Sequence, residues 1–349
     1  MNLIFNVKCF IKQFLILLIV LSFSGLTTYS YASNANDILF DDRPLDEPLV
    51  LPEWFKLSFL EIDADIKEAG EKNKKGLIIY FGQKYCPYCK AHIKNNWGQD
   101  DIVEYTQKNF DVIAIDVKGQ RPVLNVDGKT YTEKTFSALK KTNFTPSILF
   151  YNTQGREILR LRGYRPPYQF RAALEYVADK HYKKETFRNY MARAESALSF
   201  GKAELNSNEI FNSPPYLLDR SHISAGQPLM VVFERTRCHA CDVLHGGPFV
   251  RPEIEGELLK LEAVQLDMNS KKILITPDGK KLSASQWADK LNINYSPTIL
   301  FFDEKGKEII RIESVVWFYR LRNVLKYILS GGYKKYPTFQ LWRQSKNMK

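Results

Sequence analysis

Cysteine is scarce in this chain of 349 residues, and its scarcity limits the chemistry open to the protein. Cys9 lies in an apolar N-terminal segment, and the other four cysteines form two Cys-x-x-Cys pairs, Cys86/Cys89 and Cys238/Cys241. A framework of structural disulfides needs cysteines spread along the chain, so this pattern excludes one. Neither pair is followed directly by histidine, so the sequence gives no support to a covalently attached c-type haem.

Dense blocks of lysine and arginine with interleaved aromatic residues are also missing, although the formal net charge is +11. Basic and acidic residues are interspersed instead. We therefore expect a solvated basic surface and no nucleic-acid partner. The chain is 44% hydrophobic and 13% aromatic, which supplies ordinary cores, and its length suits two globular domains.

The first 32 residues have the pattern of a secretory signal peptide. Lys8 and Lys12 precede the apolar run 14–21, and Ser30-Tyr31-Ala32 has small residues at the two positions that matter for cleavage. We predict cleavage after Ala32; the alternative is an uncleaved membrane anchor over 3–26. Either way the bulk of the chain is expected to be exported to a bacterial periplasm, where dithiols can cycle with disulfides.

The segment that follows predicts an α/β unit. Four apolar runs are expected to be strands: 77–81, 112–115, 147–151 and 157–161. Three segments are expected to be helices: 54–72, 93–109 and 167–181. A helix between the first two strands implies that they pair in parallel, and Asn152-Thr153-Gln154-Gly155 has the composition of a hairpin turn between the last two.

The same order of segments returns in the second half of the chain. A shift of 152 residues places Cys86 on Cys238, and a shift of 151 places Pro146 on Pro297. One single-residue slip over such a span indicates an internal duplication of one α/β unit. We predict these parts: an extended lead-in over 33–51, a first domain over 52–182, a helical connector over 183–213 and a second domain over 214–349.

Each Cys-x-x-Cys follows an apolar strand and is expected to begin a helix. Unpaired backbone N–H groups and the dipole at a helix N-terminus stabilise a thiolate, and pairs of this kind have thiol pKa values of about 3.5–7.5, against about 8.5 for free cysteine. We therefore predict that Cys86 and Cys238 attack a substrate. Cys89 and Cys241, one turn further into the helix, would then resolve the mixed disulfide.

A proline begins the third predicted strand of each half, at Thr145-Pro146 and Ser296-Pro297. Proline lacks an N–H group and is poorly placed inside a sheet. Its duplicated position beyond a Cys-x-x-Cys predicts a cis bond whose neighbouring backbone is free to pair with a substrate.

Taken together, these features resemble the thioredoxin superfamily. The likeness covers both halves from about residue 52 and rests on these stretches: Tyr85-Cys86-Pro87-Tyr88-Cys89-Lys90, Asp127-Gly128, Thr145-Pro146-Ser147-Ile148-Leu149-Phe150 and Arg160-Leu161-Arg162-Gly163-Tyr164. Within the superfamily the chain is most similar to the exported group that includes the SoxW-type proteins of bacterial sulfur oxidation. The resemblance implies two tandem thioredoxin-like domains, each a central mixed sheet flanked by helices.

The resemblance also implies a function and its site. It implies exchange of disulfides with protein thiols without an organic cofactor, and a membrane or periplasmic electron donor or acceptor as a second partner. The residues expected to contact substrate are Tyr85, Thr145, Pro146, Gly163, Ser296 and Pro297. Thioredoxins carry a buried acid six residues before the first cysteine, but Tyr80 and Val232 stand there in this chain. Because Ser314 also replaces Gly163 in the second half, the first site is expected to be the more complete one.

Other functions fit the same residues. The chain could be a non-catalytic binding or chaperone module with a degenerate second domain. It could also bind metal through its cysteine pairs, with Cys238, Cys241, His239 and His245 as zinc ligands. For the oxidoreductase, the direction stays open because reductases, oxidases and isomerases share this machinery.

Overall fold

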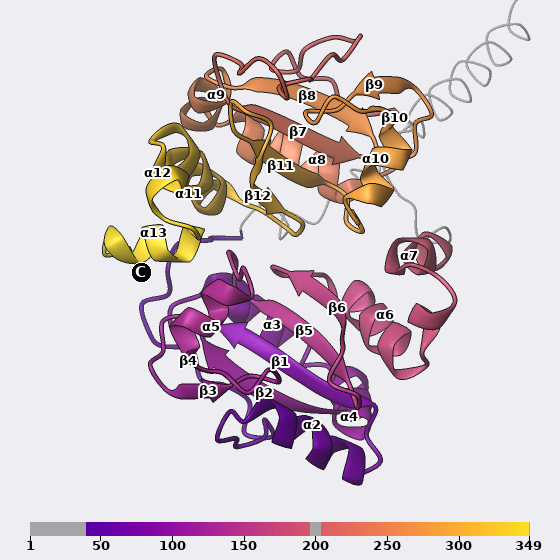
Figure 1. Ribbon diagram of the computed structural model, residues 1–349, viewed down its shortest axis with the longest axis vertical. Helices are drawn as coiled ribbons and strands as arrows, with labels where there is room; N and C mark the ends of the chain where they lie inside the picture. Colours follow the sequence, from indigo (N-terminus) through magenta and orange to yellow (C-terminus); the bar gives the residue numbers. More distant parts are fainter. Residues whose placement is uncertain (1–39, 196–203, 349) are drawn as a thin grey trace, which may run out of the picture. The chain divides into compact units, whose positions relative to one another are not determined.

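Two α/β domains with the same order of strands make up the part of the chain that the computed structural model describes, residues 40–195 and 204–348 (Figure 1). This is the predicted architecture. The predicted signal peptide, residues 33–39 of the lead-in and residues 196–203 of the connector lie outside the described residues. Within the described ranges, no helix has both the length and the apolar character needed to cross a membrane.

A four-stranded sheet in the order β2-β1-β5-β6 forms the centre of the first domain. The central strand β1 (Gly76–Gly82) pairs in parallel with β2 (Phe110–Asp116) and antiparallel with β5 (Ser147–Asn152), and β5 forms a hairpin with β6 (Glu157–Arg162). Every residue of β1 and β5 is buried, which explains why both sequences are unbroken apolar runs. The predicted parallel pair and hairpin are both confirmed.

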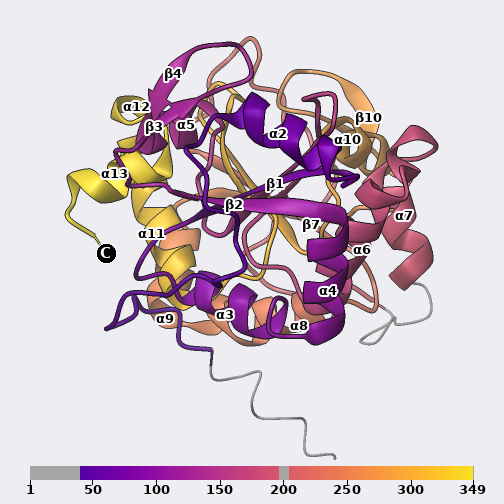
Figure 2. The same ribbon diagram turned by 90° about the horizontal axis from the view of Figure 1, so that it is seen from below.

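Helices cover both faces of this sheet (Figure 2). Residues of α2 and α5 pack on one face in a single apolar cluster with β1, and the rings of His92 in α3 and Phe170 in α6 meet on the other face. The helices and the short second hairpin of this domain have these bounds: α2 (Ile62–Glu71), α3 (Pro87–Asn95), α4 (Asp100–Asn109), β3 (Pro122–Leu124), β4 (Thr130–Thr132), α5 (Glu133–Leu139) and α6 (Pro167–Ala178).

Two helix predictions were wrong in their bounds. The helix expected over 54–72 begins only at Ile62, because Leu60 adopts a left-handed backbone with φ of 63°, and Phe59, counted on the buried face, is 94% exposed. The single helix expected over 93–109 is two helices with a break at 96–99. Gln99 has an extended backbone, and Asp100 and Asp101 follow it at the start of α4, where negative charge is favourable.

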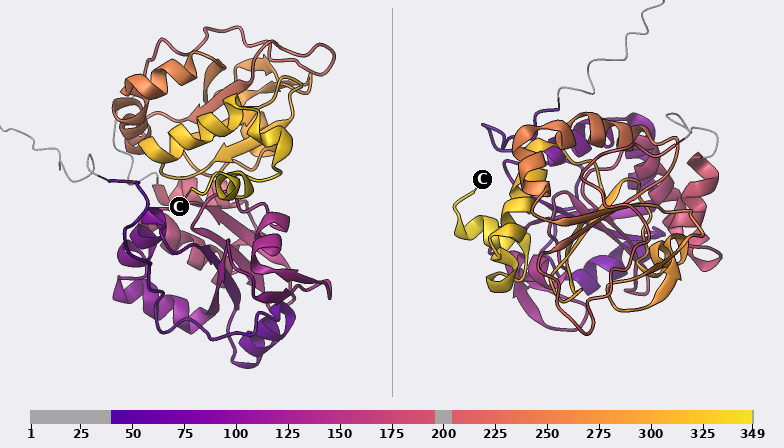
Figure 3. Two further views of the ribbon diagram at one scale, coloured as in Figure 1. Left: turned by 90° about the vertical axis from the view of Figure 1, so that its left-hand side faces the viewer. Right: turned by 90° about the horizontal axis from the view of Figure 1, so that it is seen from above.

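The second domain repeats this plan with a sheet in the order β12-β11-β7-β8 (Figure 3). Its elements have these bounds: β7 (Leu229–Glu234), α8 (His239–Gly246), α9 (Pro252–Leu258), β8 (Glu262–Asp267), β9 (Ile273–Ile275), β10 (Lys281–Ser283), α10 (Ala284–Lys290), β11 (Thr298–Phe302), β12 (Glu308–Ile312), α11 (Phe318–Leu329), α12 (Gly332–Lys335) and α13 (Phe339–Ser345). In the predicted connector, α7 (Phe187–Glu195) is helical, whereas residues 204–213 contain no helix.

Residues Asp41–Lys349 form one unit, and within it equivalent residues of the two domains meet. Glu313 stands 151 residues after Arg162, and the two form an ion pair with 2.6 Å between Arg162 Nη1 and Glu313 Oε2. Ser314, the equivalent of Gly163, lies so close to it that a Cβ atom on Gly163 would collide with Ser314 Oγ. Contact between equivalent surfaces is the geometry of a twofold dimer, here built within one chain.

Aromatic residues before each cis-proline loop take part in the same contact. Arg165 of the first domain stacks over Tyr295 of the second at 4.4 Å, and Arg320 of the second stacks over Phe144 of the first at 5.2 Å. Phe144 is 2% exposed and belongs to the apolar core of the second domain, where it packs against Phe339. The two domains therefore share part of one core.

The buried carboxylate of Glu313 gives a measurable link between the domains. Burial alone would raise its pKa, but the charges of Arg162 and Arg311 outweigh burial and hold the pKa below its ordinary value. Glu313 therefore stabilises the fold at neutral pH, and this contribution is lost as the pH falls through its lowered pKa.

We expect Glu313→Gln to lower the free energy of unfolding at pH 7 by about 3 kcal/mol, because Arg162 and Arg311 lose the negative charge of their buried partner. Urea denaturation measures the change, and the loss should shrink in acid. The control is Glu257→Gln, which breaks a surface pair with Lys260 and should cost about 1 kcal/mol or less. Equal losses in the two variants would contradict the role assigned to Glu313.

Candidate active site

The first Cys-x-x-Cys lies where β1 ends and α3 begins. Cys86 is the N-cap of α3, and its Sγ accepts a hydrogen bond from the backbone N–H of Cys89 at 3.0 Å. The Sγ atoms of Cys86 and Cys89 are within disulfide-bonding distance, and their Cα atoms are 5.1 Å apart. The predicted position at a helix N-terminus is confirmed, so backbone N–H groups face the sulfur that is expected to carry negative charge.

The second pair has the same local geometry. Cys238 is the N-cap of α8, its Sγ accepts from the N–H of Cys241 at 3.2 Å, and the two sulfurs are again within disulfide-bonding distance. Both pairs can therefore exist as a disulfide or as a dithiol, which is the basis of redox chemistry.

Each cis-proline loop lies directly against its cysteine pair. The Thr145-Pro146 and Ser296-Pro297 bonds are both cis, as predicted. Cys86 Sγ is 3.3 Å from Thr145 Oγ1, and Cys238 Sγ is 3.4 Å from Ser296 Oγ. The sheet causes this proximity, because β5 runs antiparallel to β1 and therefore begins where β1 ends.

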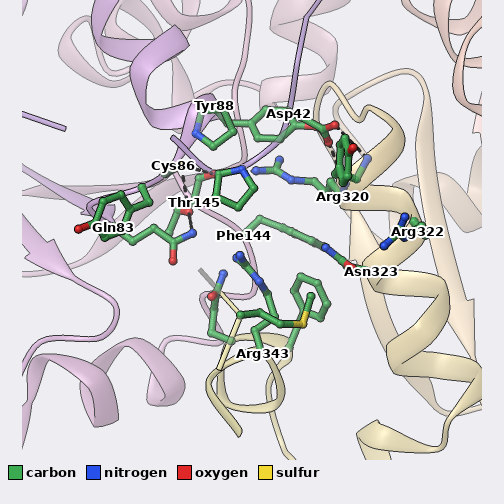
Figure 4. A pocket seen from close by; sticks show the side chains of 17 residues that line it. Asp42, Gln83, Cys86, Tyr88, Phe144, Thr145, Arg320, Arg322, Asn323 and Arg343 are labelled. Atoms are coloured by element: carbon green, nitrogen blue, oxygen red, sulfur yellow. Dashed lines mark hydrogen bonds between the residues drawn. The ribbon is translucent and has the colours of Figure 1, made fainter. Parts of the chain in front are cut away.

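The other residues predicted to contact substrate lie close by. Tyr85 and Thr145 line a cavity of about 290 Å³ that adjoins Cys86. Figure 4 shows Thr145 next to Cys86 at this cavity. The N–H of Gly163 donates to the carbonyl of Pro146 at 2.8 Å, and Ser314 fills the space beside Gly163. Contact of these residues with substrate stays a prediction.

Sequence reasoning missed a contact made by Tyr88, which stands between the two cysteines of the first pair. Tyr88 Oη donates to Asp42 Oδ2 and accepts from the N–H of Trp317, both at 2.9 Å. Asp42 in turn accepts from the N–H groups of Tyr319 and Arg320 at the start of α11. Burial raises the pKa of Tyr88 well above its ordinary value, so its hydroxyl keeps the proton that it donates. The sequence around Asp42 contains no signal that it would cap α11, so this contact could not be predicted.

Tyr80 and Val232 stand at the two positions where thioredoxin has a buried acid, so neither position provides a carboxylate. Tyr80 is fully buried, and its hydroxyl has no hydrogen-bond partner among the described residues. His92, three residues after Cys89, is also fully buried, and burial lowers its pKa to about 3. The imidazole is therefore neutral at physiological pH, with its Nδ1 2.7 Å from the side-chain amide of Asn96.

In the second domain, His245 lies next to an acid. His245 Nε2 lies 2.8 Å from Glu234 Oε1, and Gln265 donates to the other oxygen of Glu234. Across residues 40–195 and 204–348, no three His, Cys, Asp or Glu side chains are grouped so as to hold a metal ion. The geometry thus gives no support to the alternative in which Cys238, Cys241, His239 and His245 bind zinc.

Comparison with known proteins gives a match in both halves. The family model described as a thioredoxin-like domain matches residues 62–178 and 221–329. No curated protein sequence matches the chain, so the similarity to SoxW-type proteins stays a prediction.

The solved structures that match part of this chain include the following three. A thioredoxin-fold protein from Helicobacter pylori is 17% identical, with 47% of this chain and 91% of that chain covered and a TM-score of 0.32. A thioredoxin from Thermus thermophilus is 20% identical, with 34% and 85% covered and a TM-score of 0.28. A disulphide isomerase from Xylella fastidiosa is 14% identical, with 38% and 88% covered and a TM-score of 0.22.

The lowered pKa of His92 predicts a pH dependence of stability. The folded protein keeps His92 neutral down to about pH 3, whereas the unfolded chain binds a proton below about pH 6.5. Stability should therefore fall between pH 6.5 and 4 by about 1.4 kcal/mol per pH unit through this group alone. In His92→Gln, the free energy of unfolding measured by urea denaturation should change with pH less steeply by that amount. As a control, replacing the exposed His222 by Gln should leave the pH dependence of the unfolding free energy unchanged. If His92→Gln kept the pH dependence of the wild type, the assignment to His92 would be refuted.

Proposed function

Because this chain belongs to the thioredoxin-like domain family, we propose that it is a thiol-disulfide oxidoreductase that exchanges disulfides with protein thiols. The observation that carries the proposal is the repeated geometry of its two Cys-x-x-Cys pairs. Each pair begins a helix, lies within disulfide-bonding distance and touches the residue before a cis-proline. A purely structural disulfide does not require a helix start and a cis-proline loop beside it, and this chain places both beside each of its two pairs.

The proposed reaction proceeds through a mixed disulfide. In the reduced protein the Cys86 thiolate attacks one sulfur of a substrate disulfide; that S–S bond breaks, and one half of the substrate leaves as a thiolate and takes up a proton. Cys89 then loses its proton and attacks the sulfur of Cys86. The intramolecular disulfide forms, and the second half leaves as a thiol. Cys238 and Cys241 would react in the same way, and every step runs backwards when the protein acts as the oxidant.

The two sites are best tested one at a time. In a chain with Cys238→Ser and Cys241→Ser, we expect glutathione-buffered titration to give one potential for the first pair, and adding Cys86→Ser should reduce exchange with a protein disulfide to the uncatalysed rate. A potential near about −270 mV would indicate a reductase, and one near about −120 mV an oxidant of protein thiols.

The reciprocal chain, with Cys86→Ser and Cys89→Ser, measures the second pair. Replacing Cys241 alone by Ser should then trap mixed disulfides on Cys238. A second pair that neither titrates nor traps a partner would make that domain a binding module. Undiminished exchange after Cys86→Ser in the first chain would remove the first site from the reaction.

We propose further that the protein works after export, with its electrons passing to or from a membrane or periplasmic partner. The support is the pattern of residues 1–32 and the confinement of the remaining cysteines to the two redox pairs. The protein isolated from a periplasmic fraction should begin at Ser33, as read by N-terminal sequencing. A chain in the membrane fraction that retains residues 1–32 would support the uncleaved anchor instead.

A further inference from the structure

Arginine side chains of the second domain line the cavity beside Cys86. Arg320 and Arg322 come from α11 and Arg343 comes from α13, and all three are drawn around the cavity in Figure 4. Among the described residues that line it, Asp42 is the sole acid. Both oxygens of Asp42 already accept hydrogen bonds from the start of α11 and from Tyr88. The cavity is therefore positively charged next to the sulfur that is expected to react.

Arg320 is held in place by the first domain. Its Nη2 donates to the carbonyl oxygen of Thr145 at 2.8 Å, and its guanidinium lies 3.3 Å from the ring centre of Tyr88. Its Nη1 atom is shielded from solvent and has no hydrogen-bond partner among the described residues. The contacts with Thr145 and Tyr88 thus hold the positive charge of Arg320 beside Cys86.

Asp42 brings one negative charge to a cavity that three arginines line. Among the described residues, neither Arg320 nor Arg322 forms an ion pair, and Nε of Arg322 is also buried without a hydrogen bond. Burial lowers the pKa of Arg320; burial and the nearby charge of Arg320 lower the pKa of Arg343 to about 10. All three arginines are half-buried, and like charges held this close together attract an anion.

We propose that the cavity binds the carboxylate of a small disulfide or thiol substrate and so presents its sulfur to Cys86. The inference rests on the proposed function and specifies the substrate class of the first site. A guanidinium matches a carboxylate through paired N–H donors, which favours a carboxylate over a neutral group. A volume of about 290 Å³ is near the lower end of the range for small-molecule pockets, about 300–1,000 Å³, which suits a small substrate.

The reaction follows the exchange already described. The bound disulfide R–S–S–R loses one half as R–S⁻ when the Cys86 thiolate attacks, and that half takes up a proton. The attack of Cys89 then releases the second half as R–SH. Two electrons pass from the cysteine pair to the substrate, the pair becomes a disulfide, and the arginines take no part in the bond changes.

The same arginines would also stabilise the Cys86 thiolate, and this second role predicts a different outcome. A more stable thiolate changes the rate with every disulfide by the same factor. Carboxylate binding changes the rate only with acidic disulfides. A series of substrates with the same chain length and different charge therefore separates the two roles.

The test uses the full chain with Cys238→Ser and Cys241→Ser, in its reduced form. The probes are 3,3′-dithiodipropionate, bis(2-hydroxyethyl) disulfide and cystamine, which carry negative, zero and positive charge. The second-order rate constant for forming the Cys86–Cys89 disulfide is measured by acid quenching and thiol alkylation. Each constant is divided by that of dithiothreitol with the same probe, which removes the intrinsic reactivity of the disulfide.

The parent should prefer the acidic probe, and Arg343→Gln and Arg322→Gln should each lower its rate by about tenfold, the factor that corresponds to about 1.4 kcal/mol. The rate with the neutral probe should change by less than about twofold, and salt should weaken the preference. Lys326→Gln removes an exposed charge from α11 outside the cavity and should change nothing.

Three outcomes are informative. A drop by the same factor with all three probes, or a parent without preference, would overturn carboxylate binding and leave the oxidoreductase in place. If the parent reacts with none of the probes and with no protein disulfide, the proposed function itself fails. If Arg343→Gln does not fold by circular dichroism, Arg322→Gln alone decides, because the Arg322 side chain lines the cavity and makes no hydrogen bond to the described residues of the first domain.

Discussion

The antiparallel pairing of the central strand with the strand that follows the cis-proline is the constraint on which the site depends. β1 ends at the Cys-x-x-Cys, and β5 begins at the proline loop, so their pairing places Thr145 against Cys86. The same pairing of β7 with β11 places Ser296 against Cys238. Both central strands are fully buried, so a shift in register by one residue would move every side chain to the opposite face and disrupt its packing. The core therefore fixes the distance between the sulfur and the loop.

The duplication has a structural consequence that neither domain could have alone. Equivalent surfaces meet, with Arg162 against Glu313 and Phe144 within the apolar core of the second domain. These surfaces lie beside the two proline loops, so each domain contributes side chains to the surroundings of the other domain's site. Arg320 and Arg165 reach across to Phe144 and Tyr295, which stand at equivalent positions.

The two sites nevertheless have different neighbours. The first is bordered by arginines of α11 and α13, while the loop of the second adjoins α7 of the connector. Cys86 and Cys238 are both buried, at 1% and 5% exposure. Two sites with the same local geometry are therefore distinguished by α7 and α13, which lie outside the repeated core, and by the arginines of α11.

Local chemistry explains which features could be predicted from the sequence. Buried strands read as apolar runs, a Cys-x-x-Cys after a strand predicted the helix start, and the repeated proline predicted both cis bonds. The helix bounds at 54–72 and 93–109 were wrong because they depend on the backbone of single residues, such as Leu60 and Gln99, whose effect periodicity does not record.

By itself, then, the sequence determined the duplicated α/β fold and the two cysteine pairs, because both follow from contacts between neighbouring segments. Only the tertiary structure decided what surrounds Cys86. Arg320 lies 175 residues from Thr145 along the chain, and Asp42 is still further from the helix that it caps. Their meeting depends on how two duplicated surfaces pack, and that packing is set by shape and charge over both domains rather than by any local pattern.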